Sequence, residues 1–139
     1  MRSFVCTTLL AAAVSLAAFA AGISMGQEKN VNTRVYELRT YTTLPGRLPA
    51  LHKRFAEHTL KLFEKHGMKN EMYWVPEGED NKLIYFVSHA SREAADKSWK
   101  DFGADPDWQK VRGESEQDGK IVEKVERVWM KPTDYSPNR

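Results

Sequence analysis

The sequence predicts an α+β domain in which strands and helices follow one another in the order β-α-β-β-α-β. Three observations support this prediction. Residues 35–41 show the two-residue alternation of a strand. Residues 48–63 and 95–102 place apolar side chains at helical spacing. Residues 83–87 are almost continuously apolar, as expected of a strand that is covered on both faces.

A targeting segment precedes this domain. Residues 1–21 are predicted to be a signal peptide, because Arg2 precedes an apolar run at 4–18 and Ala18-Phe19-Ala20 forms a cleavage site, with 20–22 as a second one. An uncleaved membrane anchor ranks lower because the run is rich in alanine, and a mitochondrial transit peptide ranks third. We therefore expect export to the periplasm or the medium, with no stable membrane span after cleavage.

Composition limits the classes of function. The chain has 139 residues, of which 41% are hydrophobic and 29% charged, and this is ordinary for one globular domain. The net charge of +2 is small and its charges are scattered, which argues against nucleic-acid binding. The only cysteine, Cys6, lies in the signal segment, so we expect no disulfide in the mature chain. Residues 22–33 are predicted to be a polar linker and residues 34–139 the domain.

The first predicted strand has two different faces. Glu37, Arg39 and Tyr41 share one face, and Tyr36 and Leu38 share the other. A strand that faces solvent seldom carries these side chains so close together without a partner surface. We therefore expect this strand to pack against another layer.

The first helix is predicted from Pro49, which suits its first turn, to Gly67, which suits the position after its last turn. The residues expected to face the core are Leu48, Leu51, Phe55, Leu62 and Phe63. The residues expected on the opposite, solvated side are Lys53, Arg54, Glu57, Lys61 and Glu64.

The remaining elements follow from local signals. Residues 72–75 and 83–87 are predicted strands joined by a turn at 78–81, which makes a hairpin. The second helical region is expected in two parts, the first capped by Ser91 and the second by Asp105. Its expected core residues are Ala95, Trp99, Phe102 and Trp108. Residues 121–130 form the last strand, which Pro132 ends.

This element order is that of the ferredoxin-like split β-α-β fold. Right-handed crossovers then give a four-stranded antiparallel sheet of order 4-1-3-2 with both helical regions on one face. The chain is too short to cover the second face with its own residues. The simplest cover is the same face of a second copy, which predicts a barrel-like homodimer with an internal cavity.

An ordered series of residues resembles the NIPSNAP family over essentially the whole chain after the signal segment. The matching residues are 36–41, Pro45-Gly46, 65–67, Trp74, Asn81, Ser91, Asp105-Pro106, Trp108 and 132–137. The resemblance implies membership of the dimeric α/β-barrel group. His89 stands where members of the family often have an aromatic residue. Eukaryotic relatives commonly hold two such units and act at mitochondria or vesicles, and those roles are not carried over to a chain with one unit and an export signal.

Six residues are candidates for a ligand site in the barrel cavity: Glu37, Arg39, Tyr41, Trp74, Tyr85 and His89. Glu37 and Arg39 are suited to a polar or anionic ligand, although a structural ion pair at the dimer interface is the favoured interpretation. The aromatic candidates suit the wall of a pocket, and packing is again the favoured interpretation for each of them.

The histidines do not indicate a metal site, because no pair has i, i+4 spacing and there is no H-E-x-x-H motif. The resemblance leaves haem binding open through His89 or His66, since relatives in the wider barrel group bind haem through a histidine. His66 also suits the end of a helix, where a cation is favoured.

No recognisable catalytic set is present: the sequence has no G-x-S-x-G motif and no glycine-rich phosphate loop. The wider barrel group includes cofactor-independent oxygenases, which implies Arg39, Trp74 and His89 as possible catalytic groups by analogy of fold. Three hypotheses therefore stay open. The first, which we favour, is an exported homodimer with a binding or interaction role, without catalysis and without a cofactor or metal. The others are a small-molecule enzyme, similar to a cofactor-independent oxygenase, and a haem-binding protein.

Overall fold

The computed structural model describes residues 33–137 and has the predicted order of elements. The predicted signal peptide and nearly all of the polar linker lie outside the described residues. The elements are β1 (Val35–Thr43), α1 (Leu48–Arg54), the π-helical segment η1 (Phe55–Thr59), α2 (Leu60–Lys65), β2 (Lys69–Trp74), β3 (Lys82–His89), α3 (Arg92–Ala104), α4 (Pro106–Ser115) and β4 (Val122–Met130). None of the helices in this part of the chain has the length and apolar character needed to cross a membrane.

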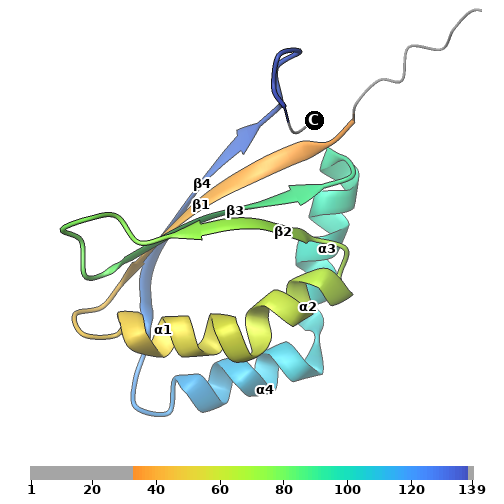
Figure 1. The fold of residues 1–139 in the computed structure, drawn as a ribbon. Coiled ribbons are helices and arrows are strands. Elements are labelled where there is room, and N and C mark those ends of the chain that lie inside the picture. The colour runs from red at the N-terminus through yellow and green to blue at the C-terminus, as the bar shows by residue number, and fades with distance from the viewer. Residues whose placement is uncertain (1–32, 138–139) are drawn as a thin grey trace, which may run out of the picture. The chain divides into compact units, whose positions relative to one another are not determined.

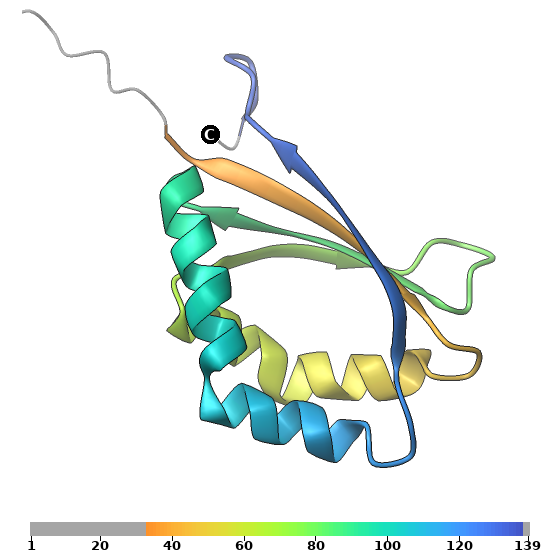
Figure 2. The ribbon, with the colours of Figure 1, turned by 180° about the vertical axis from the view of Figure 1, so that it is seen from behind.

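The sheet is antiparallel throughout and has the order β2-β3-β1-β4, which is the predicted order read from the other edge. β1 and β3 are therefore central, as the apolar character of β3 predicts. Figures 1 and 2 show all the helices on one side of the sheet, with no element over the other side. The predicted α+β ferredoxin-like fold is confirmed. We call the two sides of the sheet the covered face and the open face.

The core lies between the covered face and the helices, and aromatic rings fill much of it. Tyr85 on β3 is fully buried and stacks on Tyr73 of β2, with ring centroids 5.0 Å apart. Phe55 and Phe63 approach the Tyr85 ring from the helices, at 5.3 and 6.1 Å. Contacts of this kind add to the free energy gained from apolar burial.

The first helical region departs from its prediction in the middle. It is divided by η1, where Thr59 Oγ1 donates to the carbonyl oxygen of Arg54 at 3.1 Å. Arg54 is only 5% exposed, so its predicted place on the solvated side is wrong. The predicted end is confirmed, because Gly67 has a φ of +76° there and the Met68 amide donates to the carbonyl of Phe63.

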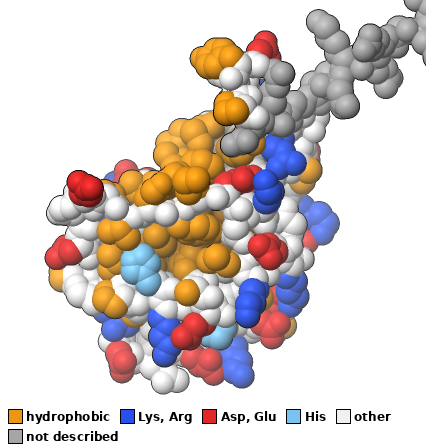
Figure 3. All heavy atoms as spheres, in the orientation of Figure 1, with side chains coloured by type: hydrophobic (Ala, Val, Ile, Leu, Met, Phe, Trp, Pro, Cys, Tyr) orange, Lys and Arg blue, Asp and Glu red, His pale blue; other side chains and the backbone are white. Residues whose placement is uncertain are grey.

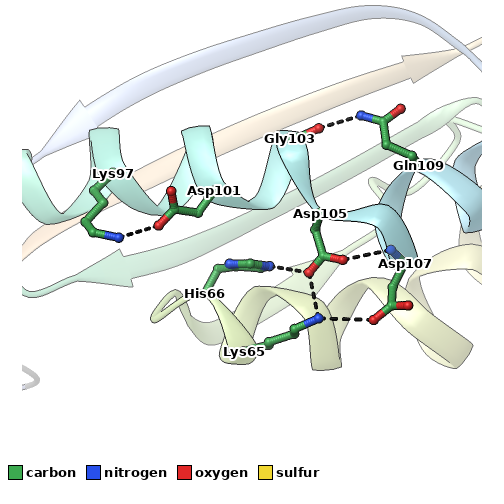
Figure 4. A network of polar contacts seen from close by, with 8 residues as sticks. All are labelled: Lys65, His66, Lys97, Asp101, Gly103, Asp105, Asp107 and Gln109. Atoms are coloured by element: carbon green, nitrogen blue, oxygen red, sulfur yellow. Dashed lines mark hydrogen bonds and ion pairs between the residues drawn. The ribbon is translucent and has the colours of Figure 1, made fainter.

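A polar network ties α2 to the junction between α3 and α4 (Figure 4). The Asp105 carboxylate accepts from the Asp107 amide at the start of α4, which confirms its predicted capping role. The other carboxylate oxygen lies 2.5 Å from His66 Nε2 and 2.8 Å from Lys65 Nζ. The hydrogen bond from Lys65, followed by that from His66, holds the pKa of Asp105 well below its usual range.

The open face is apolar at its centre. In the strand register Leu38 lies between Phe86 on β3 and Val128 on β4, and Met72 of β2 follows Phe86 outward. Val128 is 54% exposed and Met72 is 50% exposed. Trp74 packs against Phe86 with ring centroids 5.1 Å apart. Figure 3 shows hydrophobic side chains gathered along the strands at the upper side of the view.

Candidate functional site

A buried carboxylate marks the centre of the covered face. The alternation of β1 turns Glu37 towards the helices, and its side chain is 0% exposed. The Trp99 indole N–H, from α3, donates to Glu37 Oε2 at 2.6 Å. Arg39 Nη1 donates to Oε1 at 3.1 Å. A buried carboxylate is stable only with such partners, so Glu37 depends on one residue of its own strand and one of the helix above it.

His89 completes this group from β3. Its Nε2 lies 3.4 Å from Glu37 Oε2, and its side chain is fully buried. Burial raises the pKa of Glu37, but the contact with His89, the charge of Arg39 and the bond from Trp99 together hold that pKa below its usual value. Glu37 is therefore a carboxylate at neutral pH, suited to holding a cation or a proton donor in place.

Arg39 extends the group along β1. Its guanidinium lies over the Trp99 ring, 4.1 Å from the centroid, and 5.6 Å from that of Tyr41. In the strand register Arg39 faces Tyr85 on β3. Burial raises the pKa of Tyr85 well above its usual value, so the phenol stays neutral.

Polar atoms of this group remain without a hydrogen bond of good geometry among residues 33–137. They are Arg39 Nε, the Tyr85 hydroxyl and both ring nitrogens of His89. Buried polar atoms in folded proteins almost always have a partner, in the protein or in a bound molecule. The cluster therefore holds buried polar atoms whose hydrogen-bonding capacity the described residues do not use.

A cavity of about 300 Å³ lies beside this cluster, and Tyr41 belongs to both. Its other lining residues come from the first helix, α4, β4 and the segment between α4 and β4: Arg54, Trp108, Arg112, Glu116, Lys120, Val122, Glu123 and Val125. A separate groove of about 370 Å³ runs between η1 and the β2–β3 hairpin and is mostly apolar, with Phe55, Tyr73 and Trp74 among its lining residues.

The structure brings all but one of the six predicted site residues together. Glu37, Arg39, Tyr41, Tyr85 and His89 lie on the covered face. Trp74 does not join them: it packs against Phe86 of the open face and is 41% exposed.

The expected location of Glu37 and Arg39 in a cavity between two sheets is wrong. Both side chains meet Trp99 within one chain, on the side that the helices cover. The alternation of β1 separates its two faces, but it does not say which face the helices cover. A ligand role for these residues stays a prediction.

Two functional candidates had not been recognised in the sequence. The helical pattern predicts Trp99 as a core residue, and it does pack there, but its indole N–H is also a partner of Glu37. Arg54 had been placed in solvent with its charged neighbours. The sequence does hold a signal that Arg54 is buried. Arg54 follows Leu51 by three residues and directly precedes Phe55, so it lies near the helix face that carries these two apolar side chains.

The two histidines proposed for haem lie in different settings. His66 is bonded to Asp105, and His89 is enclosed beside Glu37, Trp99 and Trp129. Between residues 33 and 137 no group of three or more His, Cys, Asp or Glu side chains is arranged to hold a metal ion.

Comparison with known proteins identifies a family. The NIPSNAP family model matches residues 36–137. No curated protein matches the chain.

Solved structures share the fold. A NIPSNAP family protein of unknown function from Agrobacterium tumefaciens has a TM-score of 0.66 and 24% identity, covering 77% of this chain and 95% of that one. An uncharacterised NIPSNAP-like domain protein from Burkholderia xenovorans has a TM-score of 0.67 and 16% identity, covering 76% of this chain and 90% of that one. SnoaB, a cofactor-independent oxygenase from Streptomyces nogalater, has a TM-score of 0.55 and 13% identity, covering 76% of this chain and 99% of that one.

Proposed function

This chain belongs to the NIPSNAP family, and we propose that it is an exported homodimer that binds a small molecule on the covered face of its sheet. One observation carries the proposal. The two faces of one sheet differ in chemistry: the helix side buries charged groups and unpartnered polar atoms within its aromatic core, and the other side exposes apolar side chains. The first arrangement suits a ligand and the second suits an assembly partner.

The open face supports the homodimer. A row of apolar side chains crosses the sheet from Met72 on β2 through Phe86 on β3 and Leu38 on β1 to Val128 on β4. A row of this kind is self-complementary about a two-fold axis, because the same side chains meet from both copies. Polar side chains lie at both ends of the face, where Glu71 accepts from Ser88 and Lys124 pairs with Glu126. An apolar centre with a polar rim is the usual anatomy of a stable interface.

The covered face supports small-molecule binding. Among the buried polar atoms that lack a partner in the described part of the chain are those of three residues of the central strands, Arg39, Tyr85 and His89. The adjoining cavity has room for a small ligand, and Tyr41 links it to this cluster. A ligand that reached the cluster would satisfy donors that the protein leaves unpaired.

Native mass spectrometry of the mature protein, purified from its own host, tests both parts. The expected result is a dimer that carries additional mass, and denaturing spectra would identify the molecule released. A bare dimer purified gently would contradict the binding proposal. A monomer at micromolar concentration would contradict the homodimer, whatever it carried.

A small-molecule enzyme is the second candidate, favoured by one observation. Glu37, Arg39 and His89 place a carboxylate, a cation and an imidazole within one buried group. The test is to return the released molecule to the protein in air and to follow its mass. An unchanged mass supports binding alone. Conversion by the protein, abolished in His89→Ala but retained in His52→Ala at an exposed position, would establish the enzyme instead.

Export is proposed from the sequence alone. N-terminal sequencing of the protein recovered from the periplasm or medium should start at Ala21 or near it. Recovery of the intact N-terminus in the membrane fraction would contradict cleavage and favour an anchor.

A further inference from the structure

We propose that the cavity between β1, β4 and α4 binds a small monoanion with an apolar or aromatic body, and that Arg54 recognises its negative charge. The inference rests on the small-molecule part of the proposed function and not on the homodimer. It names the class of ligand and the residue that selects it.

The walls of the cavity suit an apolar body. Tyr41 and Trp108 supply aromatic surface, and Val122 and Val125 supply aliphatic surface from the edge strand β4. The volume of about 300 Å³ accommodates a molecule of the size of one or two fused rings. These four side chains suit an apolar body, and charged side chains line the rest of the cavity.

Arg54 supplies the charge in a setting where charge is costly. Its side chain is only 4% exposed. Nη1 donates to Ser115 at 3.2 Å and to Glu116 at 3.3 Å, and the guanidinium lies 5.4 Å from the Trp108 centroid. Nε has no partner among the described residues. Arg54 therefore lines the cavity with hydrogen-bonding capacity that its contacts within the protein do not use up.

The backbone at Arg54 is also unusual. Arg54 is the last residue of α1, and the π-helical segment η1 follows it directly. The Thr59 hydroxyl accompanies this widened turn by donating to the Arg54 carbonyl. Single π-helical turns are rare and are found frequently at functional sites. This agrees with a binding role for Arg54.

The net charge of the residues that line the cavity favours a ligand with one negative charge. Arg54, Arg112 and Lys120 line the cavity together with Glu116 and Glu123, which leaves one positive charge in excess. Glu116 lies 3.3 Å from Arg54 and 3.5 Å from Arg112, so it holds both guanidinium groups without neutralising the group as a whole. A monoanion completes the pairing, whereas a cation would be repelled.

Arg54 also borders a second cavity, between α1, η1 and α4, and charge decides between the two. There the acidic residues Glu57, Glu114 and Asp118 outnumber the basic residues Lys53 and Arg54. An anion is therefore disfavoured on that side. The same guanidinium can attract an anion only from the side of Tyr41 and Trp108.

The test compares naphthoate with naphthamide, which has the same rings and no charge. Both are titrated into the mature full-length chain, with calorimetry for affinity and NMR of the tryptophan indole N–H groups for location. We expect naphthoate to bind at least tenfold more tightly than naphthamide and to shift the Trp108 indole signal. Arg54→Gln should weaken naphthoate binding at least tenfold, Arg54→Lys should restore part of it, and Lys53→Gln, at the exposed neighbour, should have no effect.

A variant that keeps the core intact guards against misfolding of Arg54→Gln. The double substitution of Arg112 and Lys120 by Gln changes only exposed side chains and should weaken naphthoate binding severalfold. Equal affinity for the two probes, or a shift confined to Trp74 of the open face, would overturn the inference. The inference would also be overturned if naphthoate did not bind to a protein that native mass spectrometry shows to be a dimer. That result would not contradict the proposed homodimer.

Discussion

Each face of the sheet holds some side chains that the usual distribution of polar and apolar residues would place elsewhere. The covered face, enclosed by helices, holds Glu37, Arg39 and His89 in its interior. The open face, with no element over it, presents Val128 and Met72 to solvent. Globular proteins ordinarily bury apolar residues and expose charged ones. The difference separates two questions, namely what the buried charges of the covered face serve and what covers the apolar row of the open face.

The cost of each arrangement indicates its purpose. A buried carboxylate needs several partners, and Trp99 and Arg39 are committed to Glu37 for that reason. An exposed apolar row loses the free energy that burial would supply. The covered face is therefore interpreted as a site for a small molecule, and the open face as a site for a second copy of the chain. The predictions below test this division.

The largest effect is expected on the covered face. Glu37→Ala should lower the free energy of unfolding by about 3–5 kcal/mol, because it leaves the Arg39 charge and the Trp99 N–H buried without their acceptor. Urea denaturation at one fixed protein concentration measures this loss, since a dimer's stability depends on concentration.

Glu126→Ala is the matched control, because Glu126 also pairs with a cation of its own strand but is exposed. Its expected cost is below about 1 kcal/mol. Equal losses of unfolding free energy in Glu37→Ala and Glu126→Ala would show that the burial of Glu37 on the covered face adds nothing to the stability of its ion pair. If Glu37→Ala gives no folded protein, Glu37→Gln should still cost more than the control.

On the open face the expected effect is on assembly. Val128→Asp places a charge in the apolar row of the proposed interface and should raise the dimer dissociation constant by about a hundredfold or more. Analytical ultracentrifugation over a range of concentrations measures the change. Val125→Asp is the control, because Val125 is on the same strand, is 41% exposed, and pairs with Tyr41 of the covered face. Equal dissociation by both variants would argue against an interface on the open face.

The sequence predicted the fold well because its signals were local and agreed with one another. The capping residues Ser91 and Asp105, the glycine at Gly67 and the apolar run of β3 each fixed one boundary or one place in the sheet. Their order then allowed few topologies. Boundaries differ by a few residues, most at β2, which starts at Lys69 and contains a register shift after Asn70.

The site was predicted less well because it depends on contacts distant in sequence. Glu37 and Trp99 are 62 residues apart, and nothing in either local pattern indicates their hydrogen bond. The positive charge of Arg54 favoured a prediction on the solvated side of the helix, together with its exposed neighbours, although the residue is buried. A π-helical turn likewise has no simple sequence signature. Local patterns therefore predicted the elements, and only the folded chain showed which charges they enclose.

A smaller and pH-dependent effect is expected in the helix layer. Asp105→Asn should lower the melting temperature at pH 7, because the carboxylate that holds Lys65 and His66 loses its charge (Figure 4). The folded pKa of Asp105 lies below its unfolded value, so its stabilisation is present above about pH 4 and is lost as the pH falls towards the folded pKa.

Thermal unfolding of the two proteins from pH 7 to pH 3 measures this dependence. The difference in melting temperature should be constant near neutral pH and should shrink below about pH 4. An unchanged difference at pH 3 would mean that the charge of Asp105 contributes nothing. Glu126→Gln on the open face should change the melting temperature much less at every pH, since the pairing of Glu126 with Lys124 is exposed and screened by solvent.

The smallest effect is expected at the rim of the covered face, where α3 begins. The Arg92 guanidinium lies 3.7 Å from the centroid of the Trp129 ring on β4 and also pairs with Asp96 at 3.4 Å. Arg92→Gln removes both contacts and should cost about 0.5–1 kcal/mol. Asp96→Asn removes only the ion pair and should cost less than about 0.5 kcal/mol.

High salt should abolish the loss of stability in Asp96→Asn and leave most of the loss in Arg92→Gln. The reason is that Debye screening weakens an exposed ion pair more than it weakens the contact of Arg92 with the Trp129 ring. Equal costs in high salt would show that the Arg92–Trp129 contact contributes nothing. A persistent difference would show that the covered face holds its cations through aromatic rings as far as its edge, as Arg39 does with Trp99 at its centre.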